Sequence, residues 1–113
     1  MRIVRESVSR AELQLLAENS LGDYVKAVVD VDRGLMAIDG DLHADEERLL
    51  LEDGSEQTSL WGINLYPGRE GERMVEYDSM TNVRPYHGNR SRGIDSPETR
   101  ARVAAAVRRL VNS

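Results

Sequence analysis

The sequence predicts an α+β domain in which a mainly antiparallel sheet of about five strands is packed by two or three helices, in the order β-α-β-β-α-β-β-α. Two observations predict this class. Strand-like segments occur in neighbouring pairs joined by short turns, which favours antiparallel pairing, and the segments between them show apolar residues at helical spacing. The length of 113 residues and the hydrophobic content of 40% fit a single domain over residues 1–113.

The first elements are a short strand at residues 3–5 and a helix at residues 10–20. The helix begins where Ser9-Arg10-Ala11-Glu12 matches the capping box, and Val8 precedes it as half of a hydrophobic staple with Leu13. Gly22 can end the helix in a left-handed cap. Its apolar stripe consists of Leu13, Leu16, Ala17 and Leu21.

A hairpin should follow, with strands over residues 24–31 and 35–38. The first segment is rich in β-branched residues, and Asp32-Arg33-Gly34 separates it from the second. The Val28-Val29 pair suggests a buried, central strand. Asp39-Gly40-Asp41 ends the second strand.

Residues 43–53 fit either a buried strand or a helix, and the charge pattern favours the helix. Asp41 can cap it, and three acidic residues, Asp45, Glu46 and Glu47, lie near the positive end of its dipole. Gly54 then supplies a stop.

The second half predicts another hairpin and a C-terminal helix. Residues 58–66 alternate in polarity and should pair with residues 73–80, while residues 81–95 form an irregular loop. Ser96-Pro97 begins a helix with an apolar stripe at Val103, Val107, Leu110 and Val111. We expect the helices on one face of the sheet, which leaves the other for a homodimer to cover.

Composition excludes several classes of protein. The absence of cysteine excludes disulfides, thiolate nucleophiles and cysteine zinc sites. No apolar run suggests a membrane span or a signal peptide, so we expect a cytoplasmic protein without a membrane partner. A net charge of −5 argues against nucleic acid as a partner.

Charge is unevenly distributed along the chain. Residues 30–57 hold ten acidic residues against two arginines, whereas residues 81–113 hold seven arginines against two acidic residues. These segments can form complementary surfaces of one fold or dimer, or the C-terminal part can hold a local anion site.

The first candidate site is the segment from Asn82 to Gly93. We name Arg84, Asn89, Arg90 and Ser91 as its ligand-binding residues, because glycines let backbone N–H groups converge and arginines offer forked donors to a carboxylate or phosphate. Alternatively, Arg84 and Arg90 pair with acidic residues of the middle segment and fasten the loop to the sheet.

The second candidate site is Asp39-x-Asp41-x-His43-x-Asp45. Asp41, His43 and Asp45 are candidate metal ligands, and His43 with Asp45 is a candidate acid/base pair. Alternatively, the aspartates cap a helix and His43 bonds to the backbone. No particular cofactor is indicated.

Several short motifs together resemble a family of small, uncharacterised prokaryotic proteins, catalogued as a domain of unknown function. The motifs are Leu42-His43-Ala44-Asp45, Leu51-Glu52-Asp53-Gly54-Ser55, Leu60-Trp61-Gly62-x-Asn64, Asn82-x-Arg84-Pro85 and Gly88-Asn89-Arg90-Ser91. The resemblance covers nearly the whole chain and implies no activity, ligand or catalytic residue.

These observations lead to one functional hypothesis and two alternatives. The hypothesis is a small binding or regulatory domain that holds an anionic ligand or an acidic protein partner at the Arg84 loop. The first alternative is a metal-dependent or acid/base enzyme that uses His43 and Asp45, with the arginines holding substrate charge across a cleft. The second is a structural protein-interaction module.

Overall fold

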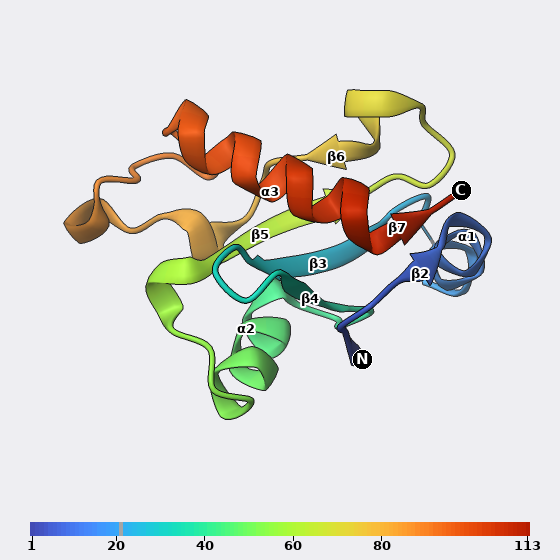
Figure 1. Cartoon of the computed structure of the whole chain (residues 1–113), viewed down its shortest axis with the longest axis horizontal. Helices are drawn as coiled ribbons and strands as arrows, with labels where there is room; N and C mark the ends of the chain where they lie inside the picture. The colour runs from blue at the N-terminus through green and yellow to red at the C-terminus, as the bar shows by residue number, and fades with distance from the viewer. Residues whose placement is uncertain (21) are drawn as a thin grey trace.

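The computed structural model describes residues 1–20 and 22–113, and in this part of the chain five strands form one antiparallel sheet. Their order is β1-β4-β3-β5-β6 (Figure 1). The strands are β1 (Arg2–Val4), β3 (Val25–Asp30), β4 (Leu35–Ile38), β5 (Leu60–Leu65) and β6 (Val75–Glu76). The predicted α+β class and order of elements are confirmed. Leu21, which we expected in the first apolar stripe, lies outside the described residues.

The centre of the sheet is β3, which pairs with β4 on one side and β5 on the other. The turn between β3 and β4 is held by Asp30, whose buried carboxylate accepts hydrogen bonds from the N–H groups of Asp32 and Arg33, both at 2.9 Å. Ser55 Oγ donates to the other carboxylate oxygen at 2.7 Å. Gly34 completes the turn with a φ of 68°, a conformation that glycine adopts without steric cost. A buried acidic side chain therefore fixes the predicted hairpin.

Three α-helices occur in the described residues: α1 (Arg10–Asn19), α2 (His43–Glu52) and α3 (Pro97–Leu110). Helices α1 and α3 begin as their capping motifs predict, because Ser9 accepts from Glu12 N–H and Ser96 accepts from Thr99 N–H. The prediction that Asp41 caps α2 is wrong. Leu42 occupies the cap position there, without a side-chain cap bond among the described residues, and Asp41 is exposed.

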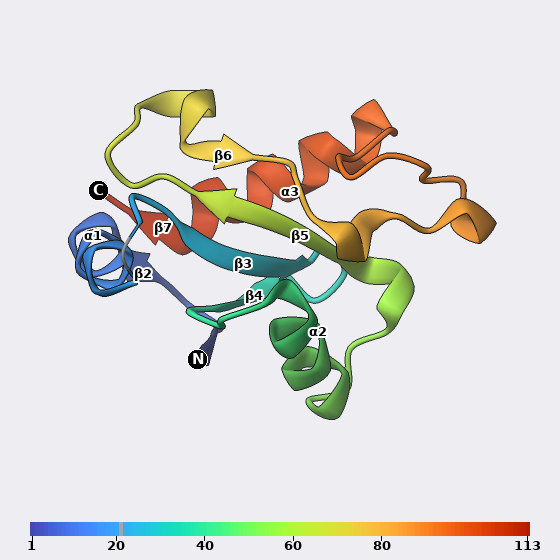
Figure 2. The ribbon, with the colours of Figure 1, turned by 180° about the vertical axis from the view of Figure 1, so that it is seen from behind.

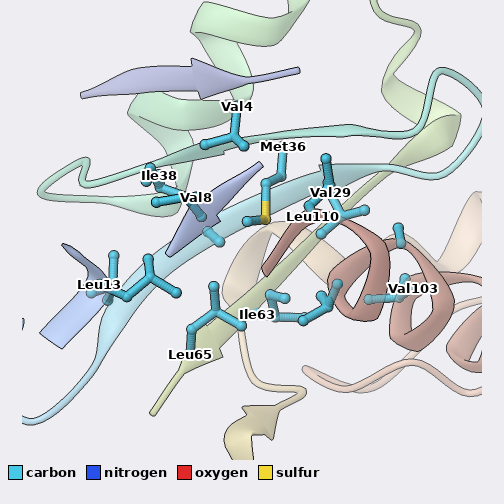
Figure 3. Close-up of a cluster of buried hydrophobic side chains, with 14 of the residues drawn as sticks. Val4, Val8, Leu13, Val29, Met36, Ile38, Ile63, Leu65, Val103 and Leu110 are labelled. Carbon is cyan, nitrogen blue, oxygen red and sulfur yellow. The ribbon is translucent and has the colours of Figure 1, made fainter. Parts of the chain in front are cut away.

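The expectation that all helices lie on one face of the sheet is also wrong. The larger apolar cluster lies between the sheet and helices α1 and α3 (Figure 3), and includes Leu13, Val29, Ile63, Val103 and Leu110. The smaller cluster lies on the opposite face under α2 (Figure 2), and comprises Val28, Leu35, Ala37, Leu50 and Leu60. Successive residues of β3 therefore face two different cores. Helix α2 packs on the face that we had expected a homodimer to cover.

The second predicted hairpin is shorter than its sequence suggests. Residues 73–80 contribute only the two-residue strand β6 and parts of two 3-10 helices, η2 (Gly71–Met74) and η3 (Met80–Asn82). A third, η1 (Gln57–Ser59), precedes β5. Two short strands that we did not predict, β2 (Val8–Ser9) and β7 (Val111–Asn112), form a parallel pair beside the main sheet.

No helix in the described ranges 1–20 and 22–113 has both the length and the apolar character needed to cross a bilayer.

We predict that Gly62→Ala destabilises the fold by about 1–3 kcal/mol, the range for forcing an extra carbon into a packed interior. A Cβ built on Gly62 would lie 2.6 Å from Ser79 Cβ and 2.9 Å from Thr81 Oγ1. Urea denaturation measures the effect. Gly68→Ala is the matched control, because the nearest atom to its added Cβ is Gln14 Oε1 at 3.9 Å. Equal stability of the two variants would contradict the prediction.

Candidate functional site

The first candidate site, Asn82 to Gly93, lies in the irregular segment over residues 79–95, which follows β6 and reaches past the end of the sheet (Figures 1 and 2). Its first anchor is Asn82, whose side chain is fully buried. The Asn82 carboxamide accepts from Gly62 N–H at 2.8 Å and donates to Gly62 O at 2.9 Å. It therefore pairs with β5 as a strand would, just beyond the point where β6 ends.

Arg84 is the second anchor, and its guanidinium points inward. It donates to the carbonyl oxygens of Leu60, at 2.7 Å, and Gln57, and its carbon lies 4.3 Å from the centre of the Trp61 ring. Burial lowers the pKa of Arg84, while the negative charge of Glu47 opposes that shift. Nε has no hydrogen-bond partner among the described residues. Arg84 therefore fastens the segment to the beginning of β5 through carbonyl oxygens rather than through an ion pair.

Asn89 is the third anchor and is 3% exposed. Its Nδ2 lies within hydrogen-bond distance of the carbonyl oxygens of Asn82, Ser91 and Gly93, at 2.7–3.1 Å. Its Oδ1 accepts from Asp95 N–H at 2.8 Å. The backbones of Arg84 and Asn89 also exchange two hydrogen bonds, of 2.8 and 3.2 Å. The polar atoms of Asn89 are thus engaged with the segment itself.

A short 3-10 turn, η4 (Pro85–His87), projects between Arg84 and Asn89. Pro85 fixes its first dihedral angle, and Gly88 ends it with a φ of 82°. His87 N–H donates to Arg84 O, and Gly88 N–H donates to Pro85 O. Tyr86 is 100% exposed at the tip.

The other two predicted residues lie where the segment turns back towards α3. Ser91 Oγ donates to Asp95 Oδ1 at 2.5 Å, and the Arg90 N–H donates to Asp95 Oδ2 at 2.8 Å. These bonds lower the pKa of Asp95, and the bond from Ser91 has the largest effect. The Arg90 residue is exposed. The four predicted ligand residues therefore lie on one segment, but Arg84 and Asn89 face inward and Arg90 faces solvent.

The residues of the second candidate site, Asp41, His43 and Asp45, do not form a common group. His43 Nε2 lies 2.8 Å from Ile63 O, and because a carbonyl can only accept, the ring donates its proton there. Burial is the main cause of the lowered pKa of His43. Asp41 is exposed, and Asp45 lies in the first turn of α2. Among the residues that the structure describes, no three His, Asp or Glu side chains form a group suited to a metal ion.

Two residues that we did not single out as site residues stand out in the structure. Tyr86 lies between Pro85 and Gly88, the residues that define its turn, and this spacing is a sequence signal for an exposed tip. Glu46, which we placed near the positive end of the helix dipole, is fully buried. Its Oε2 accepts from Gly40 N–H at 2.9 Å, and Oε1 lacks a partner within the described ranges. Burial raises the pKa of Glu46 to about 8.

The fold and this segment define a small α+β domain with an internally braced loop that presents an aromatic side chain. A family model described as "Protein of unknown function (DUF5674)" matches residues 2–110, and the chain belongs to this family. No curated protein and no solved structure matches the chain.

We predict that Asn89→Ala lowers the free energy of unfolding by about 2–4 kcal/mol, because several hydrogen bonds are lost and buried carbonyl groups remain unpaired. Chemical denaturation measures the loss, and hydrogen exchange should localise the loosening to residues 79–95. His87→Ala is the control on the same turn, because His87 is exposed. Equal stability of the Asn89 and His87 variants would contradict the assignment of Asn89 as an anchor.

We also predict a pH dependence from Glu46. Because its pKa is about 8 in the fold against an unfolded value near 4.3, the folded state holds a proton that the unfolded state loses between these values. Stability should therefore fall as pH rises from about 4.5 to 8, by up to about 1.4 kcal/mol per pH unit from this group.

Glu46→Gln should remove this contribution while keeping an oxygen acceptor for Gly40 N–H. Urea midpoints at pH 5, 6, 7 and 8 measure it, with Glu52→Gln, at an exposed position of the same helix, as the control. Identical slopes for Glu46→Gln and the unmodified chain would show that Glu46 is already ionised in the fold.

Proposed function

We propose that this domain is a protein-interaction module that binds an acidic protein partner through the turn over residues 84–90. The observation that carries the proposal is the complete exposure of Tyr86 on a turn that the rest of the segment holds in place. Tyrosine is enriched among the residues that contribute most to protein–protein binding, because its ring is large and its hydroxyl group is polar.

The rigidity of the turn supports this proposal. Its two ends are joined by the backbone bonds between Arg84 and Asn89, and the side chains of both residues are tied to carbonyl oxygens. A side chain presented on a fixed backbone loses little conformational entropy when a partner binds. An exposed Tyr86 on this turn is therefore suited to an interface.

The charges around Tyr86 indicate the chemistry of the partner. Arg90 and His87 are exposed beside the tip, whereas Arg92 is paired with Asp78 at 2.6 Å. Acidic side chains of a partner would meet Arg90 and would steer the encounter. A small anion held by Arg84 and Asn89 is less well supported, because both side chains already bond to backbone carbonyl oxygens, Arg84 to that of Leu60 and Asn89 to that of Gly93.

The enzyme alternative lacks a supporting observation. His43 donates to the backbone of β5, and Asp41 and Asp45 do not join it in a metal-binding group within the described residues.

The experiment that tests the proposal is photo-crosslinking from position 86, with p-benzoylphenylalanine in place of Tyr86, in cells that produce the protein natively. The same probe at Leu15, which is 61% exposed on α1 at the other end of the molecule (Figure 1), is the control. We expect a crosslinked protein specific to position 86, with an acidic surface.

The affinity of that protein for the purified domain should then fall by about tenfold or more with Tyr86→Ala and with Arg90→Glu, as for hot-spot residues. Leu15→Ala should leave it unchanged. Calorimetry measures the three affinities. Equal crosslinking from positions 86 and 15, or unchanged affinity of the Tyr86 and Arg90 variants, would overturn the proposal.

A further inference from the structure

A groove of about 730 Å³ runs between helix α3 and the segment formed by η2 and β6. In Figure 1, β6 lies alongside α3, and the same arrangement is seen from behind in Figure 2. Its volume falls in the range of about 300–1,000 Å³ that is typical of small-molecule sites. This groove involves none of the residues of the turn over residues 84–90.

The floor of the groove is apolar. It includes Met74, Val75, Tyr77, Ala104, Val107 and Val111. Val75, Tyr77 and Val111 are only partly buried, although they pack against the main core. Ala101 and Ala104 lie at helical spacing on the groove side of α3, where their small side chains leave room that larger residues would fill. Apolar surface is therefore open to solvent along the length of the groove.

The charged side chains that line the groove are mainly cationic. Arg10, Arg100 and Arg108 contribute to it, against one acidic side chain, Glu72. Arg100 lies over the Tyr77 ring, with its guanidinium carbon 4.7 Å from the ring centre, and donates to Ile94 O at 3.2 Å. Arg100 is thus held in position beside the apolar floor.

The arginines are spread along the groove. Arg100 and Arg108 are eight positions apart on α3, and at 1.5 Å per residue this is about 12 Å along the helix. Arg10 approaches the groove from α1 and is held by Arg69 O at 3.2 Å. An apolar chain could lie on the floor while an anionic end group meets an arginine.

We infer that this groove binds an elongated amphipathic anion, namely a small molecule with an apolar chain and a carboxylate end group. The apolar floor removes the chain from water, and the arginines favour the carboxylate over a neutral head group. The inference is independent of the proposed function, since no residue of the groove contributes to the turn that presents Tyr86.

Decanoate is a suitable probe, with decanol and acetate as the matched ligands that lack the charge and the chain respectively. Amide NMR titration should show saturable decanoate shifts at residues of α3 and β6, and binding weaker by about tenfold or more for both controls. Equal affinity for decanol would overturn the anionic class, and the absence of saturable shifts with decanoate would overturn the site.

Two pairs of variants assign the binding to the groove. Ala104→Trp should fill it and abolish decanoate binding, whereas Ala105→Trp, on an exposed position one residue further along α3, should not. Arg108→Gln should weaken binding by about tenfold, the scale of a charge-assisted hydrogen bond, whereas Arg48→Gln on α2 should not.

Circular dichroism and urea denaturation confirm that each variant is folded before it is titrated. Identical decanoate affinities within either pair of variants would overturn the assignment. The assignment would also be overturned if sedimentation shows that the chain is a dimer that Ala104→Trp disrupts and that decanoate does not dissociate.

Discussion

The pairing of the Asn82 carboxamide with Gly62 positions most of the segment between β6 and α3. Strand β5 needs partners for its outward N–H and C=O groups beyond the end of β6, and an unpaired buried backbone group is costly. Asn82 satisfies both groups of Gly62 and also donates to Arg92 O. Asn89 then bonds to Asn82 O. The irregular segment is therefore as firmly placed as a strand, although it contains no long regular element.

Much of the fold could be predicted from the sequence, because local signals mark its elements. The serine caps of α1 and α3 and the turn at Gly34 lie where the sequence places them. The side of the sheet on which α2 packs could not be predicted. Val28 and Val29 face different cores, and a strand buried on both faces shows a continuous apolar run that does not indicate which helix covers which face.

The candidate site could be located in the sequence, but the direction of its side chains could not be derived. An arginine that bonds to backbone carbonyl groups elsewhere in the fold has the same spacing and chemistry in the sequence as one that binds a ligand, so the inward orientation of Arg84 becomes evident only in the fold. Pro85 and Gly88 do mark the exposed tip at Tyr86. The burial of Glu46 also has a signal in the sequence, because Glu46 lies one helical turn before Leu50 and the two therefore share one face of the helix. Both residues are fully buried.

The parallel pairing of β2 with β7 has a consequence for the order of folding. Val8 and Val111 lie near opposite ends of the sequence, so this contact closes a loop that contains nearly all of the chain. Contacts of such long range carry the largest loop-closure entropy and tend to form late. During synthesis, β2 must therefore wait for β7 to leave the ribosome. Until then Val8, which is buried in the finished fold, lacks its strand partner, and slow translation would prolong its exposure.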